Sequence, residues 1–257
     1  MRVLVTGAAS GFGLAVAARL RARGDDVRGL DVRAAPGVLV ADVRDQDEVD
    51  RAVGAAATEL GGLDVVVNNA GVGVPVDAGA RPGPEALAAL ETNFLGAWRV
   101  TAAALPALLE SRGRVVNVAS ALASMTIPLT AAYAASKRAL VAYSDALRLE
   151  YGDRVTVTTV YPGFVRTPIH RPAEAMGVSL AGAVPEEPLE RAVGAIVRAA
   201  TGRPRRDVAT SLPTAAATFA ARHFPGTTDR VVRAHVRRLA RRGHFDRSEL
   251  RPPMLGR

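Results

Sequence analysis

Residues 2–13 read RVLVTGAASGFG, and a helical pattern of apolar residues follows them. The Val- and Leu-rich start predicts a strand over Arg2–Thr6, and the apolar spacing predicts a helix over Leu14–Arg23, which Gly24 ends. A strand that runs through a glycine-rich turn directly into a helix is typical of α/β proteins with a parallel sheet.

Each of the three glycines in this turn is favoured for a different physical reason. Gly7 permits a tight turn, Gly11 allows the backbone to approach a pyrophosphate, and Gly13 allows the helix to pack on the strand. The free N–H groups and partial positive charge at the start of the helix favour an anion. Structural turns also use glycine, but the position between the first strand and the first helix favours a dinucleotide site.

Short Val- and Leu-rich runs alternate with longer helical patterns along the first 210 residues. Further strands are expected at Val27–Asp31, Val38–Val40, Leu63–Val67, Arg114–Val118, Val155–Val160 and Asp207–Thr210. Further helices are expected at Gln46–Leu60 after an Asp45 N-cap, Pro84–Glu110 with a bend at Pro106, Ala131–Tyr151 and Pro185–Thr201. The pattern predicts one α/β domain over residues 1–210, with a doubly wound (Rossmann) parallel seven-stranded sheet and helices on both faces.

Two segments do not follow this pattern. Thr167–Val184 is rich in Pro, Gly and Ala and has weak periodicity, so we expect a mobile substrate loop there. Residues 211–257 form a basic C-terminal extension whose ten arginines and three acidic residues give +7 of the +8 net charge. Because the first 210 residues are nearly neutral, the charge distribution excludes a nucleic-acid-binding protein as the general interpretation.

The composition excludes further classes of protein. Apolar residues make up 49% of the chain and charged residues 23%, which is unlike a disordered chain. There is no cysteine, and three of the four histidines follow residue 220, so neither disulfides nor a metal site are expected. The opening apolar run is too short for a signal peptide or a spanning helix, so we expect a soluble, cytoplasmic protein.

A carboxylate at the end of the second strand indicates the type of cofactor. Asp31 follows Gly13 by 18 residues, where it can accept hydrogen bonds from adenine-ribose hydroxyls and repel a 2′-phosphate. Such a like-charge pair at about 4 Å costs about 4 kcal/mol at an effective dielectric of about 20. NAD(H) is therefore preferred, while Arg33, which can bind a phosphate, leaves NADP(H) open. Asp42 and Val43, after the third strand, are candidates for the adenine pocket.

Ser120, Tyr133 and Lys137 form the candidate catalytic group. Tyr133 and Lys137 are four residues apart on an expected helix, so their side chains project from one face. A phenol has a pKa of about 10, which a nearby ammonium would lower toward the range of a useful base. Lys137 is the only lysine in the chain, and Ser120 offers a hydroxyl to a substrate oxygen. A Tyr-x-x-x-Lys pair alone is common, so the hypothesis depends on its combination with the other motifs.

In these motifs the chain resembles the short-chain dehydrogenase/reductases, in their compact single-domain branch, over about residues 1–210. The motifs are Thr6-Gly7-x-x-x-Gly11-x-Gly13, Asn68-Asn69-Ala70-Gly71, Asn93, Ser120, Tyr133-x-x-x-Lys137 and Pro162-Gly163, in the family's order. The resemblance implies an NAD(P)-dependent oxidoreductase that interconverts a secondary alcohol and a ketone by hydride transfer. Phe12, in place of an aliphatic residue, and Ala119, in place of a frequent serine, are small departures.

The resemblance also implies a role for each matching residue. Tyr133 would be the general acid/base, Ser120 would polarise the substrate oxygen, and Asn93 would anchor a water in the proton relay. Lys137 would hold the nicotinamide ribose and lower the pKa of Tyr133. The matching cofactor-lining positions are Gly7, Ser10, Gly11, Phe12, Gly13, Asp42, Val43, Asn69, Ala70, Gly71, Pro162, Gly163, Val165 and Thr167. A homodimer or homotetramer built through the helices around residues 93–110 and 131–150 is also implied.

The substrate and the extension leave alternatives open. Apolar residues after Ser120 and in the substrate loop favour a hydrophobic small-molecule substrate, although they can equally serve only to pack the loop. They are Leu122, Ala123, Met125, Ile127, Leu129, Ile169, Met176, Val178 and Leu180. A helix over Thr228–Arg242 places apolar residues on one stripe and arginines elsewhere. It is expected to dock on its own domain or a second subunit, with an anionic membrane or an acidic carrier protein as alternatives.

Two other functions compete with the first. One is a ketoreductase of carrier-bound acyl chains, to which the basic extension would offer docking charge. The other, from a different class, is a non-catalytic regulator that senses a dinucleotide. Such a regulator is expected to have lost Ser120, Tyr133 or Lys137, and all three are present.

Overall fold

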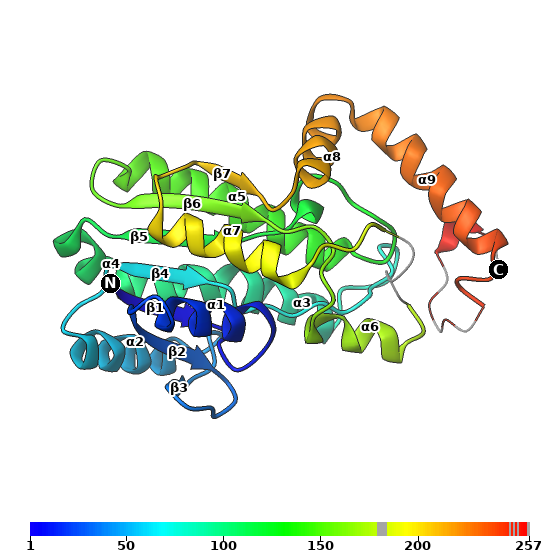
Figure 1. The fold of residues 1–257 in the computed structure, drawn as a ribbon. Helices are drawn as coiled ribbons and strands as arrows, with labels where there is room; N and C mark the ends of the chain where they lie inside the picture. Colours follow the sequence, from blue (N-terminus) through cyan, green and yellow to red (C-terminus); the bar gives the residue numbers. More distant parts are fainter. Residues whose placement is uncertain (179–183, 247, 249, 251, 256–257) are drawn as a thin grey trace.

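The computed structural model describes residues 1–178, 184–246, 248, 250 and 252–255, and it contains a parallel sheet of seven strands in the order β3-β2-β1-β4-β5-β6-β7. The strands are β1 (Arg2–Thr6), β2 (Asp26–Asp31), β3 (Val38–Val40), β4 (Val65–Asn68), β5 (Arg114–Val118), β6 (Thr156–Tyr161) and β7 (Asp207–Ala209). The predicted doubly wound sheet is confirmed, and every strand lies within two residues of its expected bounds (Figure 1).

Helices cover both faces of the sheet because alternate residues of its strands point to opposite sides. Val3 and Val5 pack with α1 (Gly11–Arg21) and α7 (Leu189–Thr201), whereas Leu4 packs with the helices of the other face. Those helices are α2 (Gln46–Leu60), α4 (Gly96–Ser111) and α5 (Ala131–Tyr151). Figure 1 shows the two helical layers on either side of the sheet.

The helix boundaries follow local chemistry. Asp45 caps α2 as expected, since its carboxylate accepts a hydrogen bond from the backbone N–H of Glu48 at 2.9 Å. Gly61 ends the same helix in the left-handed region, with φ of 70°. Helix α7 begins four residues later than expected, because Pro188 at its N-cap is extended and Glu186 instead pairs with Phe164 in an isolated bridge.

The expected single helix over residues 84–110 is divided. Helix α3 (Pro84–Leu90) leads into a π-helical segment, Glu91–Leu95, before α4 begins. Pro106 lies inside α4, so the interruption lies well before the proline to which the sequence analysis assigned a bend. The π-helical segment contains the candidate residue Asn93, and such segments often occur at functional sites.

The expected loop over 167–184 contains regular structure in its described part. A 3₁₀ turn, Pro168–His170, precedes the short helix α6 (Arg171–Ala175), and Met176 ends this helix. A helix of only five residues is too short to give a clear apolar periodicity, so the sequence did not predict α6. Residues 179–183, which include Leu180, lie outside the described residues.

The basic extension begins after β7, and its described residues contain two α-helices. Helix α8 (Leu212–His223) lies against the sheet end of the domain, and α9 (Pro225–Arg241) continues outward from it (Figure 1). Only α9 corresponds to an expected helix. Among the described residues, no helix is both long enough and apolar enough to cross a membrane.

Candidate active site

The candidate residues gather at one edge of the sheet. The glycine turn follows β1, Asp31 ends β2, the asparagine motif follows β4, and Ser120 follows β5. Because all strands are parallel, their carboxyl ends meet at this edge, which is where open α/β sheets bind ligands.

The glycine turn has the geometry of an anion site. Gly7 and Gly11 have φ values of 67° and 54°, in the left-handed region that favours glycine. A Cβ on Gly13 would lie 2.1 Å from the carbonyl oxygen of Gly7, so only glycine allows α1 to approach β1 this closely. The Ser10 side chain makes no cap hydrogen bond to α1, which leaves the N–H groups of its first turn available to a ligand.

The asparagine motif forms hydrogen bonds with the residues at the start of this turn. The Thr6 hydroxyl accepts hydrogen bonds from the backbone N–H groups of Asn69 and Ala70 at 3.0 and 2.9 Å. The Asn69 amide donates to the Thr6 carbonyl at 2.9 Å, and a Cβ on Gly7 would lie 2.9 Å from the Ala70 Cα. The side chain of Asn69 therefore holds the turn in place.

Asn68 belongs to a buried network below the site. Its amide nitrogen donates to Thr101 and Asn117, both at 2.8 Å, and Asn117 donates in turn to Ser144 at 2.8 Å. The Asn68 side-chain oxygen is buried and has no hydrogen-bond partner among the described residues. This network joins β4, α4, β5 and α5 beneath the carboxyl edge of the sheet.

Asp31 lies beside the turn with its carboxylate almost fully covered, at 7% exposure. One oxygen accepts from the backbone of Ala9 at 2.9 Å, and the other accepts from the backbone of Arg33 at 3.1 Å. The Arg33 guanidinium bridges this carboxylate and the Ser10 hydroxyl, the latter at 2.7 Å. The structure therefore brings Asp31, Arg33 and Ser10 together at the adenosine end of the proposed dinucleotide site.

The other two candidates near this end have structural partners of their own. Arg44 forms an ion pair with Asp42 at 2.6 Å, and its hydrogen bonds hold the pKa of that carboxyl below its usual range. Val43 is buried against Gly96, since a Cβ on that glycine would lie 2.7 Å from the valine side chain.

Ser120, Tyr133 and Lys137 converge as the sequence predicts. Ser120 caps a short 3₁₀ turn by accepting from the backbone of Leu122 at 3.1 Å, and its side chain hydrogen-bonds the Tyr133 phenol. The Lys137 ammonium is only 3% exposed, donates to the Val118 carbonyl at 2.8 Å, and lies 5.9 Å from the centre of the Tyr133 ring. Helix α5 supplies both of these residues, and the end of β5 supplies Ser120.

The pKa shifts differ from the expectation at Tyr133. Burial raises the pKa of the Tyr133 phenol, and the hydrogen bond from Ser120, which acts to lower it, is the smaller effect. Burial also lowers the pKa of Lys137 to about 8. Removal of water favours the neutral forms of both groups. Lys137 is not among the causes of the Tyr133 shift, so the lowering of the Tyr133 pKa by Lys137 stays a prediction.

Asn93 is buried behind the catalytic group in the π-helical segment. Its side chain accepts from the backbone N–H of Val72 at 2.7 Å and donates to the Val72 carbonyl and the Ser136 hydroxyl, both at 2.9 Å. Ser136 donates to the Tyr133 carbonyl at 2.8 Å. A Cβ on Gly71 would lie 3.1 Å from the Asn93 side-chain oxygen and 3.6 Å from the Lys137 nitrogen. Sequence reasoning missed Ser136, which precedes Lys137 and connects Asn93 to the tyrosine.

The segment after β6 completes the edge. The Pro162 carbonyl accepts from the backbone of Ala121, next to Ser120, at 2.9 Å. Val165 is buried, and its carbonyl contacts the His170 ring at 3.1 Å. Thr167 lies against the glycine turn, because a Cβ on Gly11 would approach its side chain to 3.7 Å.

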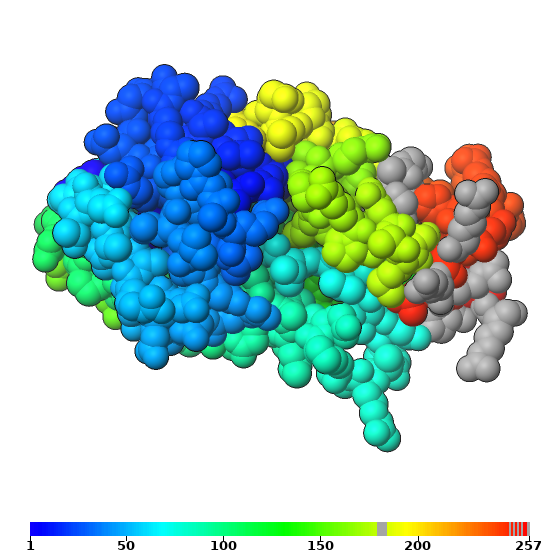
Figure 2. All heavy atoms as spheres, turned by 90° about the horizontal axis from the view of Figure 1, so that it is seen from below, coloured from blue at the N-terminus to red at the C-terminus, as the bar shows by residue number. Residues whose placement is uncertain are grey.

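Ile169 faces Tyr133 across a glycine. A Cβ on Gly73 would lie 3.5 Å from the Tyr133 ring and 3.6 Å from the Ile169 side chain. Met176, at the end of α6, is half-buried, and its carbonyl lies 3.5 Å from the Ser248 hydroxyl of the C-terminal segment. Figure 2 shows α6 (yellow-green) on the same face of the molecule as part of the basic extension (red). Among the described apolar candidates, Ile169 therefore lies close to Tyr133.

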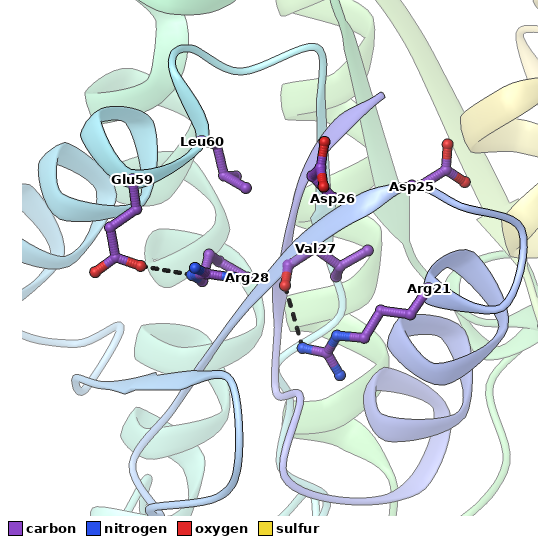
Figure 3. A pocket seen from close by; sticks show the side chains of 7 residues that line it. All are labelled: Arg21, Asp25, Asp26, Val27, Arg28, Glu59 and Leu60. Carbon is purple, nitrogen blue, oxygen red and sulfur yellow. Dashed lines mark hydrogen bonds and ion pairs between the residues drawn. The ribbon is translucent and has the colours of Figure 1, made fainter.

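A polar pocket lies at the other end of the sheet, where β2 begins (Figure 3). It is lined by Arg21, Asp25, Asp26, Val27, Arg28, Glu59 and Leu60. Arg28 and Glu59 form an ion pair across it, and Arg21 donates to the Val27 carbonyl at 3.2 Å. Asp26 lies opposite Arg2 in the pairing of β2 with β1, at the start of both strands. This pocket is therefore remote from the edge where the strands end.

Comparisons with known proteins agree with this geometry. A family model described as short chain dehydrogenase matches residues 1–177. The chain therefore belongs to the short-chain dehydrogenase family of oxidoreductases.

Two relatives illustrate the range of this family. 11-Beta-hydroxysteroid dehydrogenase 1A of Arabidopsis thaliana is 35% identical over 182 residues, which cover 64% of this chain and 52% of that protein. 2-(R)-Hydroxypropyl-CoM dehydrogenase of Xanthobacter autotrophicus is 35% identical over 187 residues, which cover 65% of this chain and 75% of that protein. The matched region thus spans about half the length of the Arabidopsis relative.

Solved structures share the fold over most of the chain. A short chain dehydrogenase from Burkholderia cenocepacia in complex with NADP has a TM-score of 0.76 and 26% identity, covering 90% of this chain and 96% of that chain. A short chain dehydrogenase from Mycobacterium paratuberculosis bound to NAD has a TM-score of 0.71, covering 80% and 94%. At 24% identity, this second likeness shows the fold alone.

Proposed function

We propose that this protein is an NAD(P)(H)-dependent oxidoreductase that interconverts a secondary alcohol and a ketone. The observation that carries the proposal is the convergence of Ser120, Tyr133 and buried Lys137 at the carboxyl edge of the sheet. A non-catalytic dinucleotide sensor has no use for this arrangement, so it is the weaker hypothesis.

The described residues fit a dinucleotide. The glycine turn and the uncapped start of α1 suit a pyrophosphate, and Asp31 suits the adenine ribose. The Lys137 ammonium has a single protein acceptor, the Val118 carbonyl, among the described residues, which leaves N–H groups to hold the nicotinamide ribose. The segment from Pro162 to Thr167 would surround the carboxamide.

The nicotinamide supplies or accepts the hydride, and the protein manages the proton. In ketone reduction Tyr133 donates its phenolic proton to the substrate oxygen, which Ser120 polarises through its hydroxyl. The raised pKa of Tyr133 keeps the phenol protonated at neutral pH and so suits this direction. Asn93 and Ser136 fix the backbone that carries Tyr133 and Val72.

The decisive test is Tyr133→Phe, which keeps the ring and removes only the transferable proton. We expect kcat to fall by about 10²–10⁴-fold, while the affinity for NADH stays within about twofold. Turnover can be followed by NADH absorbance and binding by fluorescence titration. Retention of most of kcat in this variant would remove Tyr133 from the mechanism.

We propose NAD(H) as the preferred cofactor. The Asp31 carboxylate is fixed by the Ala9 and Arg33 backbones at the position where it would repel a 2′-phosphate. Arg33 is exposed and close enough to pair with such a phosphate, and the Burkholderia relative was solved with NADP, so NADP(H) stays a candidate.

A hydrophobic substrate is proposed from the apolar groups near Tyr133. Ile169 faces the ring, and Ala123 and Leu129 are buried in the segment after Ser120. Relatives include the 11-beta-hydroxysteroid dehydrogenase and a 3-ketodihydrosphingosine reductase from Bacteroides thetaiotaomicron, 35% identical over 172 residues. A panel of steroids, retinoids, sugars and acyl thioesters, read by NADH absorbance, tests the class; selective turnover of sugars would contradict it.

A second candidate is a ketoreductase that acts on acyl chains bound to an acidic carrier. The observation that favours it is the outer face of α9, which carries the exposed side chains of Arg230, Arg233, Arg237, Arg238 and Arg241. Among the described residues, no acidic side chain forms an ion pair with them. A steep salt dependence with carrier-bound substrate, and none with a free ketone, would support this candidate.

We further propose a homodimer or homotetramer assembled through α4 and α5. Trp98 stacks on Tyr143 at 4.8 Å between ring centres yet stays 48% exposed, and Leu149 is 87% exposed. Large exposed apolar groups on these two helices suit an interface. Light scattering of the wild type and of Trp98→Glu tests this assembly.

A further inference from the structure

A buried carboxylate beyond the family-matched residues lies next to the proposed nicotinamide end of the site. Glu187 is 8% exposed and lies just before α7. The proposed mechanism does not use it, and no motif of the sequence analysis includes it. Buried carboxylates are rare unless their oxygens are satisfied, so its partners indicate its purpose.

Three hydroxyls satisfy this carboxylate, one from the last residue of the domain and two from the start of the C-terminal extension. Ser211 and Thr214 donate to one oxygen of Glu187, and Thr210 donates to the other. Burial acts to raise the pKa of Glu187, but the hydrogen bonds from Ser211, Thr210, Thr214 and the Gly163 backbone together hold it below its ordinary value. Glu187 is therefore ionised at neutral pH and joins the domain to the first turn of α8.

The same residue contacts the segment after β6. The backbone N–H of Glu187 donates to the Phe164 carbonyl at 2.7 Å. A Cβ on Gly163 would lie 2.7 Å from both the Glu187 carboxylate and the Thr214 hydroxyl, so this approach requires glycine. The Gly163 N–H also points to the Thr210 hydroxyl, at 3.3 Å. The carboxylate thus fixes Gly163 and α8 at once.

From Gly163 the connection continues to the catalytic group. The preceding Pro162 carbonyl accepts from the Ala121 backbone at 2.9 Å, and Ala121 follows Ser120 directly. A displacement of Gly163 would therefore move both the proposed carboxamide segment and the support of the catalytic serine.

We propose that Glu187 is a positioning residue for the nicotinamide end of the site, and that the extension takes part in forming this end through Ser211 and Thr214. The inference rests on the proposed function, since it concerns the geometry of that same site. Its competitor is a purely structural role, in which the cluster only caps α8; Ser211 already accepts from the Thr214 backbone at 3.2 Å.

The test compares binding of NADH with binding of ADP-ribose, which lacks the nicotinamide. Glu187→Gln replaces one acceptor oxygen by an amide donor that faces hydroxyls. The double variant Ser211→Ala, Thr214→Val instead keeps the carboxylate and removes two of the hydroxyls that donate to it. In both variants we expect NADH affinity and kcat to fall by about tenfold or more, because hydrogen bonds to a charged group are lost. ADP-ribose affinity should stay within about twofold. If the wild type prefers NADPH, the matched pair is NADPH and 2′-phospho-ADP-ribose.

Glu186→Gln is the matched control. Glu186 precedes Glu187, but its side chain is exposed and pairs with Arg166 at 3.0 Å, so this variant should bind both ligands like the wild type. Equal losses for NADH and ADP-ribose, or no loss for either, would overturn the proposal in favour of a structural cap. If Glu187→Gln fails to fold, the Ser211→Ala, Thr214→Val variant decides by the same criteria. A wild type that binds neither dinucleotide would instead contradict the proposed function.

Discussion

Three charged groups at the carboxyl edge of the sheet are buried, whereas those of α9 in the C-terminal extension are exposed. Asp31, Lys137 and Glu187 are each less than 10% exposed, and each has defined hydrogen-bond partners. The arginines of α9 are exposed, and the described residues offer them no acidic partner. The effect of a buried charge depends on its position and on the chemistry of the group that carries it. The effect of an exposed charge depends mainly on its sign. Substitutions of equal charge should therefore separate the two regions.

The largest effect is expected at Lys137. Its ammonium donates to the Val118 carbonyl and lies close to Gly71, and a planar guanidinium is bulkier than this compact ammonium. We expect Lys137→Arg to lower kcat by about 10²–10⁴-fold although the charge is kept. Steady-state kinetics would measure this, with Arg237→Lys on α9 as the matched control that should behave like the wild type.

The same residue predicts a pH dependence. Burial lowers the pKa of Lys137 to about 8, so the ammonium loses its proton as the pH rises through that value. We expect kcat/KM for ketone reduction to decline above about pH 8 as this charge is lost. A profile that stays flat up to pH 9.5 would contradict a functional role for the charge.

The next largest effect concerns Asp31. Removing its carboxylate in Asp31→Ala abolishes the repulsion of a 2′-phosphate and releases Arg33 to attract one. We expect the ratio of kcat/KM for NADH to that for NADPH to fall by about 10–100-fold, as one or two close charge contacts would give. A wild-type preference for NADPH would show that Arg33 outweighs Asp31.

A smaller effect, on stability, is expected from the buried Glu187. Its folded pKa lies below the ordinary value of 4.5, so its contribution to stability is complete above pH 4.5 and is lost as the pH falls through the folded pKa. We expect Glu187→Gln to lower Tm by several degrees at pH 7, and by less near pH 3. Calorimetry at both pH values tests this. In the control Glu186→Gln, the change in Tm relative to the wild type should be the same at both pH values.

The sequence predicted the sheet, and the meeting of the motif residues at its carboxyl edge, for physical reasons. Val- and Leu-rich runs specify buried parallel strands, and the motif residues follow those strands directly, so the topology alone brings them together. Tyr133 and Lys137 needed only helical spacing. These signals are local, and tertiary packing preserved them.

The missed features depend on contacts between distant residues. Helix α8 and the Glu187 cluster involve ordinary Ser and Thr residues that meet a carboxylate only after folding. The π-helical segment has no composition that separates it from the helices around it. The direction of the Tyr133 pKa shift follows from burial, which spacing does not reveal.

The smallest effect on activity is expected from the arginines of α9. Arg230→Gln, Arg237→Gln and Arg241→Gln, combined, remove charge from its outer face and leave its buried Val236 in place. We therefore expect kcat with a free ketone and Tm to stay close to the wild-type values. Binding to vesicles with anionic phospholipid, or to an acidic acyl carrier, should weaken by about 100-fold at low salt, since each arginine near such a surface contributes about 1 kcal/mol.

A control triple variant with the same net charge separates this local effect from total charge. Arg51, Arg81 and Arg203 are exposed and lie elsewhere, so their replacement by Gln should weaken such binding much less. Sedimentation with vesicles and titration with the carrier distinguish the two partners of the α9 face. Equal losses in both triple variants would show that only net charge matters. A loss of kcat confined to the α9 variant would show instead that its arginines act on the catalytic edge, and the contrast between buried and exposed charges would fail.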